Sequence, residues 1–550
     1  MLSLLGKVLN RFGAYIYPDS YYYLLVAKNL HENLHPVGTL GEGGMPFPPA
    51  GYAAMKVTYP LGIAKLAPFG LSGEAAARFV TVSAAVVCVP LAWWATRRLF
   101  GSERTALGAA TLVAFSYGIT FWSGFVLSDS LSLALAFLAL ALFARERADA
   151  LSNPADALLG LILVLLLLTR PAYVAVIPFV IWGGAGEWRW TWRRGLTVAV
   201  AALLVLSGVA AAWFPPADVT ASIARNLAPL LLAIAALAAG LGAAAVRARR
   251  TRLALAPGRV RTLATVAACA FLALWLAERM PVWLGAEPWF SGWGRFAPRD
   301  VAVLLAAAPG VWALWGRGRD RVVAALLAGS IAMTGVYFAV ESFESRYLIH
   351  ILPLLMPLAG GALAFAWHEE ATASRVPRAA RAAVAALLAC ALAWQAALAL
   401  GAAETAHLRT DYPREVAYGA RDAVREGDVV VTALPWPLHH HLGVPTWGVA
   451  PEANRATSPA FLGEKPVVVI DDAAMQLFYP LVSERLEAGF SETDTFEVPV
   501  RYSYGRLTVT DQEPVRVYRL TQSELRSVVD TRAASPDLVS AYDEANNALR

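Results

Sequence analysis

The chain has 550 residues, of which 57% are hydrophobic and 16% charged, and its mean hydropathy is +0.51. A soluble domain rarely carries so much apolar surface, so this composition excludes an ordinary soluble protein and indicates a membrane protein. The formal net charge of +5 does not indicate nucleic-acid binding, because the basic residues lie in short loops between apolar runs, where membrane topology accounts for them.

The N-terminal segment, residues 1–16, is apolar but includes Lys7, Asn10 and Arg11. It is too short to cross a hydrocarbon core, which needs about 20 residues. Either a first helix is truncated at this end of the chain, or these residues only dip into the membrane interface. We favour truncation. If the alternation of loop charge described below holds, Asp19 lies outside, and a helix that crosses the membrane must precede it.

The first loop, 17–75, carries an acid near its start. Asp19 precedes a predicted helix over 21–34 and can serve as its N-cap, a position that aspartate favours. A carboxylate held there can also act as a general base that takes the proton of an acceptor hydroxyl attacking a sugar carbon. Both roles can hold together.

Further along the first loop, the segment 41–49 is rich in glycine and proline and indicates a lid or a lining wall. Glu42 within this segment and Lys56 beyond it are candidate substrate-binding residues.

Apolar runs long enough to span a membrane, or nearly so, follow one another along the chain. They lie at about 76–96, 105–121, 127–144, 156–169, 171–186, 195–213, 227–246, 262–277, 300–315, 321–340, 348–367 and 382–400.

Arginine-rich and arginine-poor loops alternate along the chain between these runs. The arginine-rich loops hold Arg97, Arg98 and Arg104; Arg145 and Arg147; Arg189, Arg193 and Arg194; the arginines between 247 and 261; Arg317, Arg319 and Arg321; and Arg375, Arg378 and Arg381. By the positive-inside rule these loops face the cytoplasm, so the first loop and everything after 401 lie outside.

Beyond about 405 the pattern changes to that of a small α/β domain. Buried strands are predicted at 428–432 and 466–471, helices at 413–426 and 473–488, and further strands at 496–502, 506–510 and 515–520. The polar stretch 521–550 is predicted to hold a helix and a loose tail. We therefore divide the chain into a transmembrane domain, 1–404, and an extracytoplasmic domain, 405–550.

Asp129 lies where an outer loop enters a span. It can be a plain helix cap, but an ionisable group at membrane depth is expensive and usually functional. It can orient the acceptor, or share a divalent metal ion with Asp19.

Two arginines are candidate phosphate ligands, because a guanidinium binds phosphate through two parallel hydrogen bonds. Arg346 precedes the span that opens at 348 and can instead pair with Glu341 or Glu344. Arg170, before Pro171, interrupts a long apolar run, so it can bind phosphate or simply mark a turn.

Two motifs in the outer domain have simpler interpretations. His439, His440 and His441 are consecutive and do not converge easily on one metal ion. Asp471-Asp472 follows a strand, but no glycine-rich phosphate loop precedes it, so a strand-end turn and a helix cap are favoured.

Taken together, these motifs resemble those of the GT-C glycosyltransferases, and in particular the protein O-mannosyltransferase and lipid A aminoarabinose transferase group. The resemblance rests on order and sidedness along about 1–400: Tyr17-Pro18-Asp19-Ser20 after a first span, Pro48-Pro49, Ser128-Asp129, Thr169-Arg170-Pro171, and Ser345-Arg346-Tyr347 with Pro353. The expected fold has about 12 transmembrane helices, or 13 with a restored first helix, and an outer α/β domain.

The resemblance implies a polyprenyl-phosphate-linked sugar as donor, transfer on the outer face of the cell membrane, and inversion at the anomeric carbon. It implies Asp19 as the base and Arg346 as a ligand of the donor phosphate. We add Asp129 as a second catalytic candidate, Arg170 as a second phosphate ligand and Tyr347 as a candidate substrate contact. Ser20 stands where many relatives have a second acid. That leaves open the use of a divalent cation as well as the identity of the sugar.

Two rival functions remain. A polytopic transporter or lipid flippase has as many spans, but it usually shows broken helices and related halves near the membrane midplane, which are not seen here. A non-catalytic scaffold would depend on 405–550 rather than on Asp19. The acceptor can be a protein, a lipid or a cell-wall glycan.

Overall fold

The structure is a computed structural model that describes residues 18–34, 36, 38–39, 46–47, 56–71, 73–144, 154–184, 192–213, 300–315, 318–340, 349–366, 378–405, 412–449, 465–504 and 507–529. The chain divides into two compact units. The helical unit consists of 1–11, 78–124 and 128–404. The second unit consists of 12–77, 125–127 and 405–550, and we call it the outer unit after the location predicted from the sequence. The first loop and the C-terminal domain therefore belong to the same unit.

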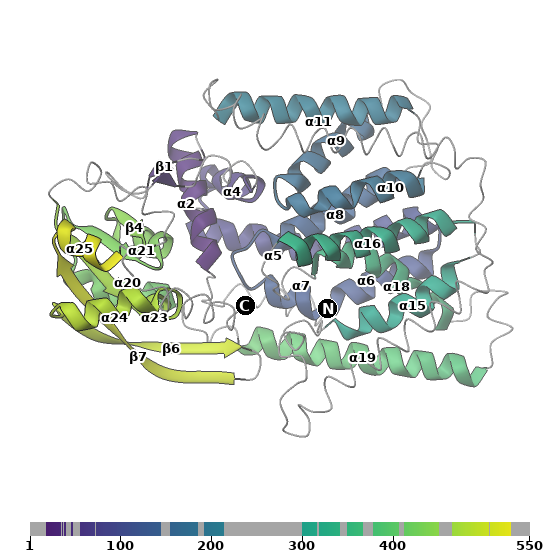
Figure 1. Cartoon of the computed structure of the whole chain (residues 1–550). Coiled ribbons are helices and arrows are strands. Elements are labelled where there is room, and N and C mark those ends of the chain that lie inside the picture. Colours follow the sequence, from purple (N-terminus) through teal and green to yellow (C-terminus); the bar gives the residue numbers. More distant parts are fainter. Residues whose placement is uncertain are drawn as a thin grey trace. The chain divides into compact units, whose positions relative to one another are not determined.

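The helical unit is built from apolar helices that follow the predicted spans (Figure 1). Its elements are α5 (Gly73–Phe100, from Arg78), α6 (Glu103–Ala114), α7 (Tyr117–Trp122), α8 (Asp129–Phe143), α9 (Pro154–Leu167), η3 (Pro171–Ala175), α10 (Ile177–Gly184), α11 (Trp192–Trp213), α15 (Val301–Leu314), α16 (Asp320–Val340), η6 (Ile349–Ile351), α18 (Leu352–Ala366) and α19 (Arg378–Thr405). The predicted spans 227–246 and 262–277 lie outside the described residues.

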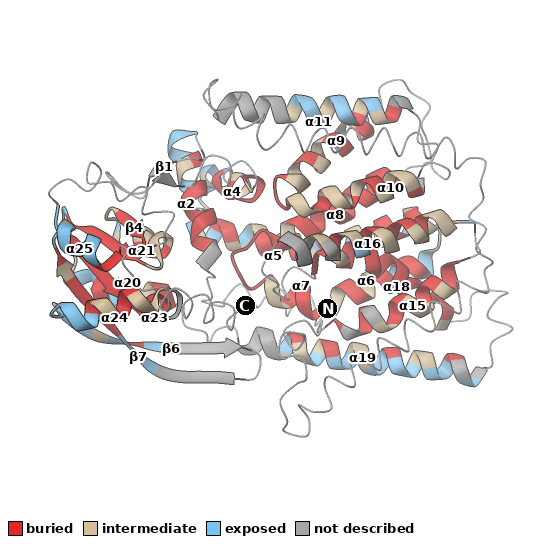
Figure 2. Cartoon of the chain, viewed as in Figure 1, coloured by how far each residue is buried: buried red, intermediate tan, exposed pale blue. Residues whose placement is uncertain are grey.

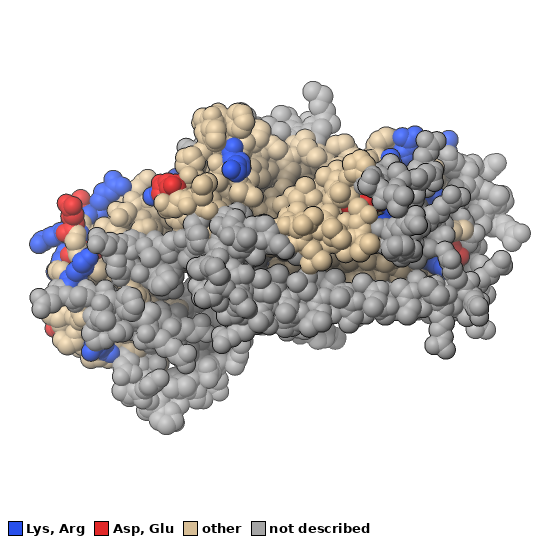
Figure 3. Space-filling model, turned by 90° about the horizontal axis from the view of Figure 1, so that it is seen from above, with Lys and Arg blue, Asp and Glu red and all other residues tan. Residues whose placement is uncertain are grey.

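Three stretches of described helix are long and apolar enough to cross a membrane: Gly73–Phe100, Ile349–Ala366 and Arg381–Leu400. Shorter apolar helices accompany them, among them Asp129–Phe143 and Pro154–Leu167. Figure 3 shows a broad uncharged surface over the described part of this unit, with Lys and Arg gathered toward one end. The predicted fold class, an α-helical membrane protein with a C-terminal α/β domain, is confirmed.

The apolar run 105–121 forms two helices rather than one. α6 ends at Ala114 and α7 begins at Tyr117, because Ser116 between them is an N-cap whose Oγ accepts from the Ile119 N–H. Serine is among the preferred N-caps, and a single one does not disturb the apolar composition of the run. The Asp300 carboxylate also accepts from the Gly118 N–H at 2.9 Å, which fixes the new helix start.

Glycines let α18 pack closely between two other helices. A Cβ on Gly360 would collide with the backbone of α6 at Thr105 and Ala109, and one on Gly361 would meet Leu314 of α15 at 2.8 Å. Small residues at helix crossings are typical of membrane bundles, where close backbone approach replaces the hydrophobic effect as the source of stability. This packing fixes α18 and, with it, the short helix η6 that precedes it.

In the first loop, the outer unit contains α2 (Pro18–Asn33), the two-stranded pair β1 (Gly38–Thr39) and β2 (Pro46–Phe47), α4 (Thr58–Ala64) and η2 (Ala67–Phe69). α2 begins at Pro18, earlier than predicted, because proline suits the first turn of a helix. Tyr21, Tyr22 and Tyr23 are all buried. The Tyr23 ring packs edge-on against Tyr59 of α4, whose hydroxyl donates to the Ala77 carbonyl.

The C-terminal domain folds around a mixed five-stranded sheet of order β4-β3-β5-β7-β6. β3 runs parallel to β4 and β5, whereas β7 is antiparallel to β5 and forms a hairpin with β6. The elements are α20 (Tyr412–Gly419), η9 (Ala420–Asp422), β3 (Val429–Thr432), α21 (Pro435–Leu442), β4 (Thr446–Gly448), β5 (Val467–Asp471), α23 (Ala473–Phe478), α24 (Pro480–Gly489), β6 (Asp494–Tyr504), β7 (Leu507–Leu520) and α25 (Gln522–Val529).

Helices cover both faces of this sheet, which explains why its central strands read as unbroken runs of valine (Figure 2). Successive side chains of a strand point to opposite faces. Val429 and Val431 therefore pack with α24 and α25, whereas Val430 packs with α20 and α21.

Three features of this domain differ from the prediction. The segment 506–520 forms one strand rather than two, because Pro514 lies in the part of β7 that pairs only with the edge strand β6 and so breaks no central ladder. α21 and β4 were not predicted, since both are short. The helix predicted over 413–426 ends at Gly419 and continues only as η9.

Candidate functional site

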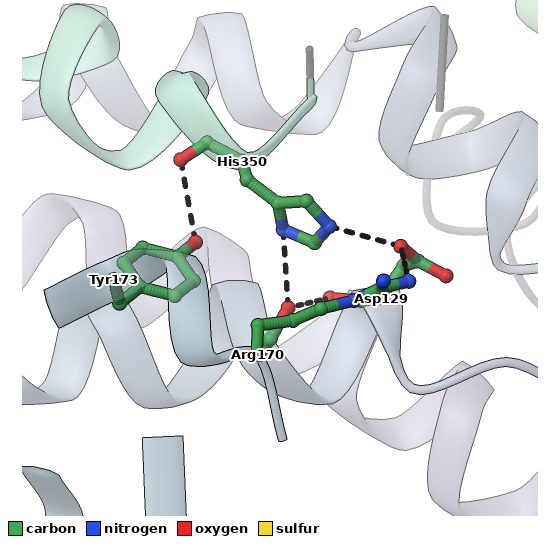
Figure 4. A network of polar contacts seen from close by, with 5 residues as sticks. Asp129, Arg170, Tyr173 and His350 are labelled. Carbon is green, nitrogen blue, oxygen red and sulfur yellow. Dashed lines mark hydrogen bonds and ion pairs between the residues drawn. The ribbon is translucent and has the colours of Figure 1, made fainter. Parts of the chain in front are cut away.

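The candidate site in the helical unit is centred on the carboxylate of Asp129. Asp129 is the first residue of α8 and is fully buried. Its Oδ1 accepts from Arg170 Nη2 at 2.6 Å and lies 2.9 Å from His350 Nε2 (Figure 4). An ionised carboxylate only accepts hydrogen bonds, so the His350 Nε2–H is the donor.

An interruption between two helices positions Arg170. α9 ends at Leu167 and η3 begins at Pro171, and Arg170 between them has an extended backbone with φ −146° and ψ 97°. The proline imposes this, because its ring disfavours the helical conformation in the preceding residue. Arg170 is 3% exposed, so the turn places a guanidinium inside the protein.

His350 was missed by the sequence analysis. It lies in η6, is fully buried, and has Nδ1 3.2 Å from Ser132 Oγ. The Ser132 hydroxyl also donates to the Asp129 carbonyl at 2.7 Å, and the Tyr173 hydroxyl donates to the His350 carbonyl at 3.3 Å. The available signal was an ionisable residue at the start of an apolar helix.

These contacts join α8, η3 and η6, three segments far apart in sequence, into one buried polar network (Figure 4). Burying two charges costs free energy that their attraction only partly returns. Removing one partner leaves the other charge buried and uncompensated, which lowers the stability of the fold by about 3–5 kcal/mol. The arrangement fixes a guanidinium and an imidazole at one carboxylate. It therefore holds two hydrogen-bond donors in place at the end of apolar helices.

The remaining predicted site residues are distributed as follows. Asp19 is the second residue of α2, in the outer unit, and its side chain lies outside what the structure describes. Lys56 lies in the turn just before α4. Glu42, Arg346 and Tyr347 lie outside the described residues. Of the predicted site residues, the structure brings Asp129 and Arg170 into direct contact.

Metal binding finds no support in the part of the chain that the structure describes. Those residues contain no group of three or more His, Cys, Asp or Glu side chains that could hold a metal ion. His439 instead uses Nδ1 to contact the Val444 carbonyl at 2.8 Å, at the turn after α21. A divalent cation shared by Asp19 and Asp129 stays a prediction.

The histidines of α21 are partly buried, and this changes their titration. Burial, together with the smaller effects of His440, Arg414 and Arg421, lowers the pKa of His441 to about 4. The pKa values of His439 and His440 are also lowered, chiefly by burial. These imidazoles are therefore neutral near pH 7.

The Asp471-Asp472 pair has the structural role favoured from sequence. Asp472 is the N-cap of α23, with Oδ1 accepting from the Met475 N–H at 2.9 Å. Asp471 accepts from the Ser483 hydroxyl at 2.8 Å and lies 3.8 Å from Arg516. Burial raises the pKa of Asp472 to about 7.

The raised pKa of Asp472 predicts a specific pH dependence of stability. Between pH 3.8 and about 7 the folded domain binds this proton more tightly than the unfolded chain, so the Asp472 contribution to stability falls as pH rises through that window. Asp472→Asn keeps a capping oxygen but removes the ionisation, so it should match wild type near pH 4. Above pH 7 it should be more stable, by on the order of 4 kcal/mol.

The measurement is the unfolding of the outer domain in the full-length protein at pH 4 to 8, by hydrogen exchange of the buried β3 and β5 amides corrected for the intrinsic pH dependence of exchange. Asp494→Asn, at an exposed position, is the matched control. A stability difference between Asp472→Asn and wild type that does not change with pH would contradict the prediction.

Comparison with known proteins supplies a fold but no close relative. No family model and no curated protein matches the chain. The oligosaccharyltransferase of Archaeoglobus fulgidus, solved with a tethered acceptor peptide, matches with a TM-score of 0.54 at 14% identity over 97% of this chain and 77% of that one. The oligosaccharyltransferase AglB from the same organism, solved with an inhibitory peptide and a dolichol-phosphate, matches with a TM-score of 0.54 at 13% identity over 96% of this chain and 77% of that one.

ArnT from Cupriavidus metallidurans, bound to undecaprenyl phosphate, matches with a TM-score of 0.51 at 13% identity over 94% of this chain and 96% of that one. All of these are GT-C glycosyltransferases. At such low identity the likeness concerns the fold alone, and the fold of this chain resembles that of these GT-C glycosyltransferases.

Proposed function

We propose that this protein is a membrane glycosyltransferase that moves a sugar from a polyprenyl-phosphate donor to an acceptor hydroxyl on the outer face of the cell membrane. Two of the solved structures that share its fold hold a polyprenyl phosphate: undecaprenyl phosphate in one and a dolichol-phosphate in the other. A lipid-linked donor also suits a chain with many apolar helices, because the polyprenyl tail can stay in the bilayer while the sugar phosphate reaches the outer surface.

The observation that carries the proposal is the buried network around Asp129. Ionisable residues at membrane depth are expensive and mark functional sites. Here a fully buried carboxylate contacts both Arg170 and His350. We assign Asp129 the role of holding Arg170 and His350 in position, and Arg170 and Arg346 that of attracting the donor phosphate. Glu42, Lys56 and Tyr347 remain proposed substrate contacts.

The proposed reaction is a single displacement. Asp19 takes the proton of the acceptor hydroxyl as its oxygen attacks the anomeric carbon. The bond between that carbon and the phosphate oxygen breaks, and its electron pair leaves with the polyprenyl phosphate. A phosphate is already a weak base, so no general acid is needed, unlike ordinary glycoside hydrolysis. Attack from the face opposite the leaving group inverts the anomeric carbon.

The experiment that tests this proposal follows both halves of the donor. Full-length protein in vesicles receives a labelled polyprenyl-phosphate sugar and a membrane extract as acceptor source. Transfer predicts that sugar becomes covalently bound to the acceptor while an equal amount of polyprenyl phosphate is released. Movement of intact donor across the bilayer with no covalent product would instead support a transporter or flippase.

A further inference from the structure

A contact inside the outer unit joins the first loop to the C-terminal domain. The Tyr21 hydroxyl of α2 lies 2.8 Å from His441 Nε2 of α21. The Tyr21 ring also packs against His440 and His441, at centroid distances of 5.4 Å and 5.2 Å. α2 and α21 therefore meet through both a hydrogen bond and aromatic packing.

A second aromatic contact extends this interface along α2. The ring of Tyr22 lies 5.6 Å from that of Trp436, near the start of α21. Tyr21 is fully buried and Tyr22 is 3% exposed. Two consecutive tyrosines of α2 are thus enclosed against one short helix of the C-terminal domain.

α21 itself is fixed from the other side. Its residues Pro437 and Leu438 are buried in the domain, and Leu438 belongs to the core beneath the sheet. His439 contacts the Val444 carbonyl after the helix end, and the ring of Tyr418 on α20 packs against His441 at 5.8 Å. The partner that α2 contacts is therefore a firmly held part of the domain.

The charge state of His441 suits this contact. Burial lowers its pKa to about 4, so near neutral pH the imidazole is uncharged and offers one acceptor nitrogen. A neutral ring can be enclosed against tyrosines without the cost of burying a charge.

From this geometry we infer that His441 is a positioning residue: through Tyr21 it holds α2, and with it Asp19 two residues earlier, in the orientation that the transfer reaction requires. The inference rests on the proposed function. It gives the C-terminal domain a specific task, which is to hold the first-loop helix rather than to contact the sugar. Small displacements of a catalytic group lower rates steeply, so a distant hydrogen bond can matter.

The test combines two measurements on the full-length protein. Hydrogen exchange of the α2 amides reports the contact directly, whatever the enzyme does. His441→Ala and Tyr21→Phe should each raise that exchange by about five- to tenfold, the change expected from losing one hydrogen bond. In the transfer assay, both should lower kcat by about tenfold with little change in the donor KM. His441→Gln, whose amide can bond the tyrosine hydroxyl again, should restore most of the rate.

The matched control is Asp428→Asn, which weakens the domain away from α2. Asp428 accepts from Arg519 at 3.0 Å and 2.9 Å inside the domain. This variant should loosen the sheet but leave α2 exchange and the rate near wild type.

Unchanged α2 exchange in His441→Ala, or equal loosening of α2 in Asp428→Asn, would overturn the positioning role. If wild type transfers no sugar but α2 amide exchange rises in His441→Ala, the proposed function is overturned. The structural contact between α2 and α21 is then still supported.

Discussion

Asp19→Asn is expected to lower sugar transfer by about 10²–10⁴-fold, the usual effect of removing a general base. The amide has nearly the shape of the carboxylate but cannot take the proton of the acceptor hydroxyl. Donor binding should change little, because the proposed phosphate ligands are untouched. The loss should therefore appear in kcat, measured with labelled donor at saturating concentration.

Loss of folding cannot explain so large an effect. Asp19 is the second residue of α2, where a negative charge stabilises a helix by only about 0.3–1 kcal/mol. The matched control is Glu32→Gln, which neutralises an exposed acid near the other end of the same helix and should transfer normally. Asp19→Asn with more than about a tenth of wild-type kcat would fall outside the range for a lost base and would remove Asp19 from that role.

The second large effect concerns the buried pair of Asp129 and Arg170. Arg170→Gln leaves Asp129 buried without its cationic partner, and Asp129→Asn leaves Arg170 without its anion. Each single variant should lose about 3–5 kcal/mol of stability together with most of its activity. Thermal unfolding in detergent measures the first effect and donor transfer the second.

The double variant Asp129→Asn/Arg170→Gln separates structure from function. It removes both charges and should regain most of the lost stability, because no uncompensated charge stays buried. It should remain inactive, since the guanidinium that attracts the donor phosphate is gone.

The chain offers a matched control for this pair. Asp156 and Arg194 form another buried ion pair, 2.9 Å apart, at the starts of α9 and α11, which we predict to face the cytoplasm. The double variant Asp156→Asn/Arg194→Gln should be as stable as the first one but keep transfer. A double variant at Asp129 and Arg170 that is folded and fully active would show that this network serves stability alone.

The sequence predicts most of the helical unit because lipid or protein surrounds each span, so a long apolar run has few alternatives to a helix. The prediction from sequence fails where a single polar residue starts or ends a helix. Ser116 starts a new helix inside an apolar run through a single hydrogen bond. In the outer domain, the valine-rich strands β3 and β5 were predictable, whereas β4 has three residues and no pattern of its own.

The sequence predicted two of the residues of the candidate site, but not the contacts between them. Asp129 and Arg170 stood out because charge is rare in apolar runs, but they are 41 positions apart, and only tertiary packing pairs them. His350 is a lone histidine whose partner, Asp129, lies 221 positions away. The contact between Tyr21 and His441 spans 420 positions and has no local signature.

The most direct test of the central claim is sugar transfer by the purified, detergent-solubilised protein from a panel of radiolabelled polyprenyl-phosphate sugars. A membrane extract supplies the acceptor, and wild type is compared with Asp19→Asn. We predict that wild type alone labels the acceptor and that the active donor identifies the sugar. If no donor in the panel yields labelled product, the glycosyltransferase assignment is contradicted.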